Sequence, residues 1–104
     1  MRILLLALIL TLVAAAPAAA RTKTVKVGDD FFKPKTLSVS KGTTVKWTWT
    51  GRDSHNVTVT KGPSSFRSSL KRSGTFKHKM SRRGTYKIIC TIHAPDMRMT
   101  INVR

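Results

Sequence analysis

The sequence has one cysteine and few acidic residues, and these shortages exclude several classes of protein. Its 104 residues include four acidic residues, all of them aspartate. A single cysteine rules out a disulfide within the chain, although disulfides commonly stabilise small exported domains. Carboxylates are common general acids and bases, and no Ser-His-Asp combination can be placed. We therefore do not expect an enzyme, and we expect stabilisation from another source, such as a bound metal.

Long hydrophobic runs are absent apart from the first twenty residues. Arg2 is followed by an almost entirely apolar segment, Ile3–Ala16, and then by the small residues Ala18–Ala20. This order of charge, apolar run and small residues is typical of a secretory signal peptide, and the run is short for a membrane span. The sequence thus predicts a cleaved signal peptide over residues 1–20. A single domain over residues 21–104 would then be exported, to a periplasm or out of the cell.

Negative charge is scarce and positive charge is abundant. Lys and Arg total 20 against four Asp, for a formal net charge of +16. Such a surface keeps a small protein soluble and attracts anionic partners. We expect a monomer that binds partner proteins through their acidic docking surfaces, with peripheral contact to an anionic cell surface as a further expectation. The basic pairs Lys71-Arg72 and Arg82-Arg83 are not interleaved with stacking aromatics, so no nucleic-acid partner is expected.

Apolar and polar residues alternate in seven short segments, and no segment keeps a helical period for three turns. Alternation places every second side chain on one face of a β-strand. Turn residues separate the segments, as the connections between strands require. The pattern predicts an all-β antiparallel sandwich or small barrel of seven or eight strands. The sets expected to face inward are Val25/Val27, Leu37/Val39, Val45/Trp47/Trp49, Val57/Val59, Phe76/His78/Met80, Tyr86/Ile88/Cys90 and Met99/Ile101/Val103.

Cys90 stands at the end of one of these segments, and the short turn that follows it contains His93 and Met97. His55 comes just before another segment, and a sandwich can bring its loop beside this turn at one end of the fold. A thiolate, two imidazoles and a thioether are the ligand set typical of a copper site for electron transfer. Zinc accepts cysteine and histidine but does not favour a thioether. A bound metal would also protect the lone thiol of Cys90 from oxidation.

Four motifs spread over most of residues 21–104 carry a family resemblance. They read DDFFKPKTLSVSKGTTVKWTW, DSHNVTV, GTFKHKMSRRGTYKIICTIHAPDM and TINV, at residues 29–49, 53–59, 74–97 and 100–103. With these motifs in this order, the chain resembles a cupredoxin of the plastocyanin/amicyanin type. The resemblance implies a Greek-key antiparallel β-sandwich and an exported one-electron carrier that works between redox partner proteins.

The resemblance also implies a ligand set. His55, Cys90 and His93 would be the strong equatorial ligands of one copper ion that cycles between Cu(I) and Cu(II). Met97 would be the long axial ligand. Asn56, which follows the first ligand, would brace the two ligand loops by hydrogen bonding.

The surroundings of these ligands complete the implied picture. The exposed edge of His93 would be the exit for the electron, among neutral residues such as Ala94 and Pro95. Copper enzymes on this fold need further histidine clusters, and the three histidines of this chain include no His-x-His pair. An oxidase or nitrite reductase is therefore not expected.

Three alternatives stay open on the sequence alone. Met99 is a rival axial ligand, although its alternation with Ile101 and Val103 favours a place in the core and leaves Met97 as the preferred ligand. His78 alternates with core residues, so we expect a half-buried core histidine rather than a second metal site. Copper storage, scavenging or delivery without redox turnover is the alternative to electron transfer, because the ligand set serves either.

Overall fold

The computed structural model describes residues 21–104, and this part of the chain forms eight β-strands and no helix. No helix long and apolar enough to cross a membrane occurs among these described residues. The signal peptide expected over residues 1–20 lies outside them. The strands are β1 (Thr22–Gly28), β2 (Phe31–Lys33), β3 (Thr36–Val39), β4 (Thr44–Trp49), β5 (Thr58–Lys61), β6 (Thr75–Lys79), β7 (Gly84–Ile89) and β8 (Arg98–Val103).

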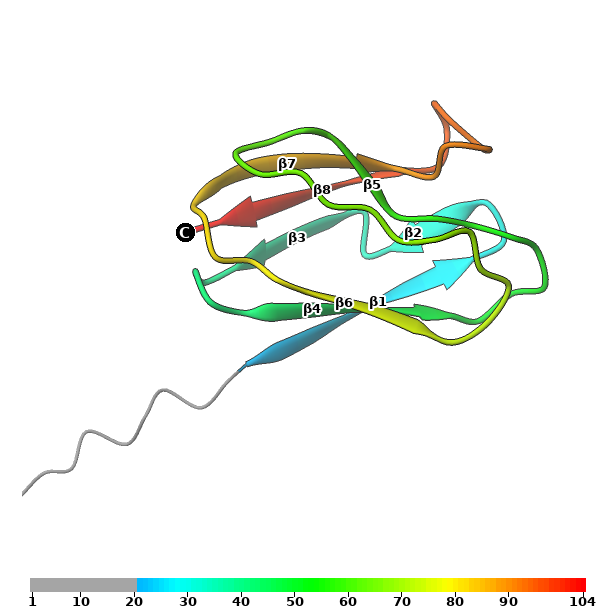
Figure 1. Ribbon diagram of the computed structural model, residues 1–104, viewed down its shortest axis with the longest axis horizontal. Coiled ribbons are helices and arrows are strands. Elements are labelled where there is room, and N and C mark those ends of the chain that lie inside the picture. The colour runs from blue at the N-terminus through cyan, green and yellow to red at the C-terminus, as the bar shows by residue number, and fades with distance from the viewer. Residues whose placement is uncertain (1–20) are drawn as a thin grey trace, which may run out of the picture.

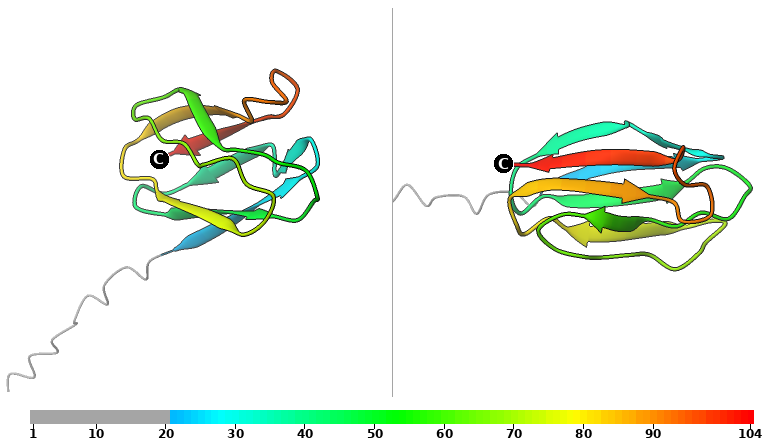
Figure 2. Two further views of the ribbon diagram at one scale, coloured as in Figure 1. Left: turned by 45° about the vertical axis from the view of Figure 1, so that its right-hand side comes forward. Right: turned by 90° about the horizontal axis from the view of Figure 1, so that it is seen from above.

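The strands form two four-stranded sheets that pack face to face (Figures 1 and 2). Their strand orders are β2-β1-β4-β6 and β3-β8-β7-β5. The expected β-sandwich is confirmed, but the sheets are mixed, because β1 pairs with β4 and β3 pairs with β8 in parallel. The expectation of wholly antiparallel sheets was wrong for these two pairs. Alternation reveals which face a side chain takes, and it carries no information on the direction of the neighbouring strand.

The core lies between the two sheets and is built from alternate residues of each strand. In β4, for example, Val45, Trp47 and Trp49 are buried while the residues between them are partly exposed. Trp47 packs at ring-centroid distances of 5.8 Å from Phe66 and 5.7 Å from Phe76. Burial of each large apolar side chain contributes about 1.5–3 kcal/mol. The interpretation of the two tryptophans as core residues is therefore confirmed.

Two features of the fold escaped the alternation pattern. β2 has three residues, of which only Phe32 is buried, so it is too short to show alternation. The segment 66–71 has no strand pattern, yet it runs beside residues 55–59. Ser68 N–H donates to the carbonyl oxygen of Val57, and Val59 N–H donates to that of Phe66. This segment therefore covers the residues that lead into β5.

The loops expected to hold the metal ligands lie at one end of the sandwich, opposite the C-terminus (Figure 1). The loop between β4 and β5 and the loop between β7 and β8 both project there. The turn between β1 and β2 reaches the same end. Tertiary structure thus gathers three segments that are far apart in the sequence.

Candidate metal centre

Cys90 and His55, two of the candidate ligands, are fully buried. Cys90 directly follows β7, in phase with the buried Tyr86 and Ile88, and is itself fully buried. His55 is fully buried and lies two residues before the buried Val57. Cys90 is thus held by the end of β7, and His55 by an isolated bridge to Lys71.

The backbone of His55 is fixed from two sides. It exchanges hydrogen bonds with Lys71, whose carbonyl oxygen lies 2.9 Å from His55 N and whose N–H lies 3.0 Å from His55 O. The indole N–H of Trp49 also donates to the carbonyl oxygen of His55, at 3.2 Å. A core tryptophan and the neighbouring segment therefore set where this imidazole stands.

The turn after β7 is closed by hydrogen bonds among three of the candidate ligands. His93 N–H donates to Cys90 O at 3.3 Å, Met97 N–H donates to His93 O at 3.2 Å, and Cys90 N–H donates to Met97 O at 3.1 Å. Met97 is fully buried, whereas the side chain of His93 is 28% exposed. The turn thereby holds Met97 inside and leaves one edge of His93 near the surface.

Three potential ligand atoms meet at this point. Cys90 Sγ lies 3.5 Å from His93 Nδ1 and 3.9 Å from His55 Nδ1, and the two Nδ1 atoms are 3.2 Å apart. A d-block ion such as zinc binds at about 2.0–2.1 Å from imidazole nitrogen and about 2.3 Å from thiolate sulfur. A triangle of this size can accommodate one such ion in contact with all three atoms. The structure therefore brings His55, Cys90 and His93 together as one group.

The outer nitrogen of each imidazole faces a carboxylate. His55 Nε2 lies 3.1 Å from Asp29 Oδ1, and His93 Nε2 lies 3.1 Å from Asp30 Oδ1. The contact of His55 with Asp29 is a hydrogen bond. Because an ionised carboxylate only accepts hydrogen bonds, the neutral ring of His55 carries its proton on Nε2 and presents Nδ1 as an acceptor. The contact of His93 with Asp30 places the carboxylate at ion-pair distance from the ring. The Nδ1 atoms of both rings lie beside Cys90 Sγ. A metal cation would satisfy all three inward atoms, and this donor set suits copper.

Asp29 is held in place by the loop that precedes His55. Its carboxylate accepts hydrogen bonds from the backbone N–H of Arg52 and from that of Asp53, at 3.1 and 3.0 Å. The Asp53 N–H, the His55 side chain and the Arg52 N–H lower the pKa of Asp29 from 3.8 to about 2. Asp29 is therefore ionised at neutral pH. Sequence analysis gave no role to Asp29 and Asp30, although two consecutive carboxylates in a chain with four were a usable signal.

Asn56 joins the two ligand loops. Its Nδ2 donates to Thr91 Oγ1 at 2.7 Å, and its Oδ1 accepts from Thr91 N–H at 2.9 Å. These contacts connect the residue after His55 with the residue after Cys90. The brace predicted from the family resemblance is confirmed.

The two methionines near this end occupy different surroundings. The sulfur of Met99 accepts a hydrogen bond from the indole N–H of Trp47, at 3.4 Å in the core. Met99 also lies in β8, opposite Ile88 of β7. The interpretation of Met99 as a core residue is therefore confirmed, and Met97 remains the preferred axial ligand.

His78 lies away from the three-ligand group, in β6. It is partly buried and stacks on Phe66, with ring centroids 3.9 Å apart and planes at 20°. Burial lowers its pKa below the usual value of 6.5. This confirms the expectation of a half-buried histidine packed against the core.

Comparison with known proteins now places the chain in a family. The family model of the cupredoxin-like domain matches residues 2–103. The chain belongs to the cupredoxin-like family. This cupredoxin is 32% identical over 94 residues to plastocyanin of Prochlorothrix hollandica, a match that covers 79% of this chain and 72% of that protein. Its identity to plastocyanin of Dryopteris crassirhizoma is 31% over 100 residues, covering 77% and 98% of the two proteins.

Solved structures support the same assignment. A mutant of amicyanin in its reduced Cu(I) form superposes with a TM-score of 0.70 at 25% identity, covering 88% of each chain. A copper-containing nitrite reductase from Thermus scotoductus superposes with a TM-score of 0.68 at 27% identity, but the match covers 78% of this chain and only 22% of that enzyme. The chain is thus a cupredoxin of the plastocyanin/amicyanin type, as its motifs predicted.

Proposed function

We propose that this cupredoxin is an exported one-electron carrier with a single copper site. His55, Cys90 and His93 are the equatorial ligands in this proposal, and Met97 is the axial ligand. The main support for it is that the Cys90 thiol and the Nδ1 atoms of both imidazoles converge at one point. The Nε2 atom of each ring faces a carboxylate on the outer side. Copper, when bound, supplies a centre that changes by one electron between Cu(I) and Cu(II).

The protein's own contribution is to hold the ligands still. The three ligand atoms already lie 3.2 to 3.9 Å apart, so binding requires little rearrangement. Strand ends, the closed turn after β7 and the Asn56 brace resist movement of the ligands. A rigid ligand set supports fast electron transfer, because little energy is spent on reorganisation. In the proposal Met97 is the axial ligand, and the contact of the Met99 sulfur with Trp47 argues against the rival assignment.

The surface beside His93 supports docking of a redox partner. The exposed large hydrophobic residues among the described part of the chain are Phe31, Leu70 and Ile92. In the sequence, Ile92 is next to His93 and Phe31 is next to Asp30. Leu70 is next to Lys71, which is hydrogen-bonded to His55. Exposed apolar residues beside a functional site are candidates for contact with a partner. In the proposal, the electron leaves through His93 toward a partner that covers this surface.

Positive charge supports the choice of an acidic docking surface on the partner. A hollow of about 540 Å³ lies along the second sheet and extends to Pro95 in the ligand turn. Lys35, Lys87 and Arg98 line it, and none of its lining residues is a carboxylate. Charges of this sign would steer an acidic partner toward the metal end of the molecule.

Export and maturation are part of the proposal. Residues 1–20 would be removed as a signal peptide, and residues 21–104 would act as a monomer in a periplasm or outside the cell. The relatives named plastocyanin support a carrier rather than an enzyme. The high positive charge would also favour peripheral contact with an anionic cell surface.

The visible absorption spectrum tests the copper site. Residues 21–104 would be prepared with one equivalent of Cu(II), beside the Cys90→Ser variant. We expect an intense blue band from thiolate-to-copper charge transfer, absent in the variant, and reversible bleaching on one-electron reduction. A colourless product from the wild-type protein would refute the site. A blue protein that exchanges no electrons with redox partners would refute the carrier and leave copper storage or delivery.

A further inference from the structure

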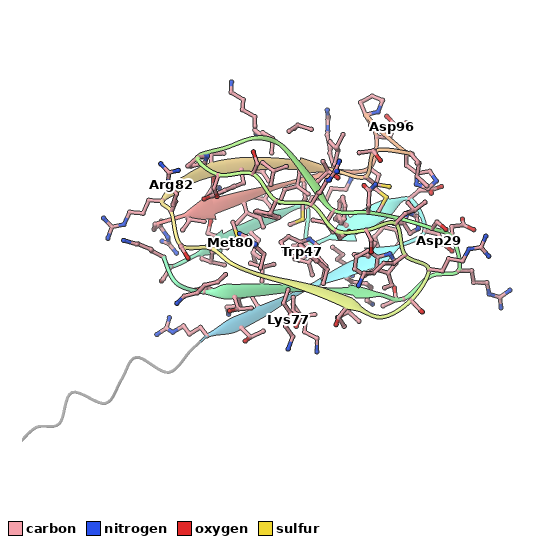
Figure 3. The ribbon with its side chains drawn as sticks, viewed as in Figure 1. Asp29, Trp47, Lys77, Met80, Arg82 and Asp96 are labelled. Carbon is pink, nitrogen blue, oxygen red and sulfur yellow. The ribbon has the colours of Figure 1, made fainter. Side chains whose placement is uncertain are left out.

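The turn between β1 and β2 supplies a carboxylate to each of the two site histidines. Asp29 Oδ1 lies 3.1 Å from His55 Nε2, and Asp30 Oδ1 lies 3.1 Å from His93 Nε2. The chain has four carboxylate side chains, and two of them are used here. Figure 3 shows Asp29 at the metal end of the sandwich, where the ligand loops lie. One turn therefore contacts both imidazoles from outside the ligand loops.

The position of Asp29 depends on the loop before His55. Besides the imidazole, its carboxylate contacts the backbone N–H groups of Arg52 and Asp53. Gly51 allows this approach, because a Cβ at that position would collide with the Asp29 carboxylate. The carboxylate is therefore fixed by the backbone as well as by the histidine.

Asp30 reaches His93 from a left-handed backbone conformation, with φ of +69°. Aspartate and asparagine adopt this region more readily than most other residues. The Asp30 side chain is 63% exposed, yet its oxygen meets the ring edge that we expected to be surrounded by neutral residues. The surface edge of His93 therefore carries a negatively charged partner in addition to the apolar residues nearby.

We propose that Asp29 and Asp30 are positioning residues that hold both imidazoles with Nδ1 toward the metal and favour Cu(II) over Cu(I). This inference rests on the proposed function. A carboxylate that accepts the outer N–H of a ligand histidine fixes the ring and raises its basicity as a ligand. A more basic ligand and a nearby negative charge both stabilise the higher charge of Cu(II). The pair therefore lowers the reduction potential of the site below that of a site with neutral partners.

The Asp30→Asn variant tests the proposal with little disturbance of the fold. Asparagine has nearly the same size and tolerates the same backbone conformation. It exchanges the charged acceptor for a neutral amide. We expect the preference for Cu(II) over Cu(I) to fall about tenfold, which for a one-electron couple raises the potential by about 59 mV. The measurement is a redox titration followed at the visible band.

Asp96→Asn is the matched control. Asp96 lies in the ligand turn at the same end of the molecule (Figure 3) and makes no ion pair among residues 21–104. The Asp96→Asn substitution removes the same charge, and Asp96 forms no ion pair with His55 or His93. A clearly larger shift for Asp30→Asn than for Asp96→Asn supports the proposal. Equal shifts, or no shift for Asp30→Asn, would overturn it, since the contact with the ring would then be irrelevant.

A second measurement uses the copper-free protein and does not depend on the proposed function. Nitrogen-15 NMR of the imidazoles reports which ring nitrogen carries the proton. At a pH where the rings are neutral, we expect the wild-type His93 proton on Nε2. In Asp30→Asn we expect a mixture of the two tautomers at His93 and no change at His55. An unchanged His93 would overturn the positioning role even if the protein bound no copper at all.

Discussion

Asn56 spans the two loops of the metal centre by donating to the hydroxyl of Thr91 at 2.7 Å and accepting from its backbone N–H at 2.9 Å. The residues that precede them, His55 and Cys90, supply two of the three converging ligand atoms. This side chain therefore joins the two loops directly. It adds to the backbone contacts that hold His55 and Cys90 separately.

We predict that Asn56→Ala loosens the site more than it weakens the fold. Both hydrogen bonds with Thr91 and the one that Asn56 accepts from the Thr58 hydroxyl would be lost, at about 0.5–1.5 kcal/mol each. Copper should also dissociate about tenfold faster, because the ligands would no longer be held at the right spacing. Urea unfolding of the copper-free protein and stopped-flow removal of copper by a chelator measure the two effects.

Asn102→Ala is the control for that prediction. Asn102 accepts a hydrogen bond from Thr85 at 3.1 Å in the paired strands β7 and β8. Its loss should reduce stability by about 0.5–1.5 kcal/mol and leave the copper dissociation rate unchanged. Equal acceleration of copper release in both variants would show that general stability, and not the brace, retains the metal.

The two methionines should respond differently to replacement by leucine. Met97→Leu should keep the protein folded and raise the reduction potential, because a weak axial ligand tunes that potential. Met99→Leu should leave the visible spectrum and the potential unchanged. It should cost about 1–2 kcal/mol of stability, because the buried indole N–H of Trp47 would lose its acceptor. A changed spectrum in Met99→Leu, with none in Met97→Leu, would reverse the axial assignment.

Association with an acidic redox partner should depend on the cations of the hollow along the second sheet. Electron transfer from the partner should slow as salt concentration rises, because steering by exposed charges is screened. The double variant Lys87→Gln/Arg98→Gln should slow association several-fold at low salt. Lys77→Gln removes a charge from β6 in the other sheet (Figure 3) and should have less effect. Stopped-flow rates over a salt series test this, and equal effects of both changes would argue against steering by the charges of the hollow.

His78 should make stability depend on pH. Burial holds its folded-state pKa below 6.5, whereas the unfolded chain keeps the ordinary value. Below about pH 6.5 the unfolded state therefore binds more protons, and the free energy of unfolding falls as pH decreases. His78→Phe should keep the stacking on Phe66 and flatten this part of the profile. Melting temperatures of the copper-free proteins from pH 8 to 5 provide the measurement, and parallel profiles would contradict it.

The sequence by itself determined the β-sandwich, the core faces and the short turn that holds Cys90, His93 and Met97. Alternation of apolar and polar residues in segments such as Tyr86–Cys90 predicts which side chains face inward, because side chains along a strand alternate between its two faces. The spacing of Cys90, His93 and Met97 was equally readable, since these residues share one short turn. Such features are local, so neighbouring residues suffice to reveal them.

Only the tertiary structure decided what depends on contacts between distant segments. The parallel pairing of β1 with β4, and the contact of Trp47 with Met99, join residues whose separation along the chain carries no signal. Asp29 and Asp30 stand out as consecutive carboxylates, but they lie more than twenty residues before the nearest candidate ligand, so the sequence does not say which residues they contact. They meet the imidazoles because packing of the two sheets brings the turn between β1 and β2 to the end where the ligand loops lie. A carboxylate in a turn is ordinarily a solvated group, and here the fold places it against an imidazole of the candidate metal centre.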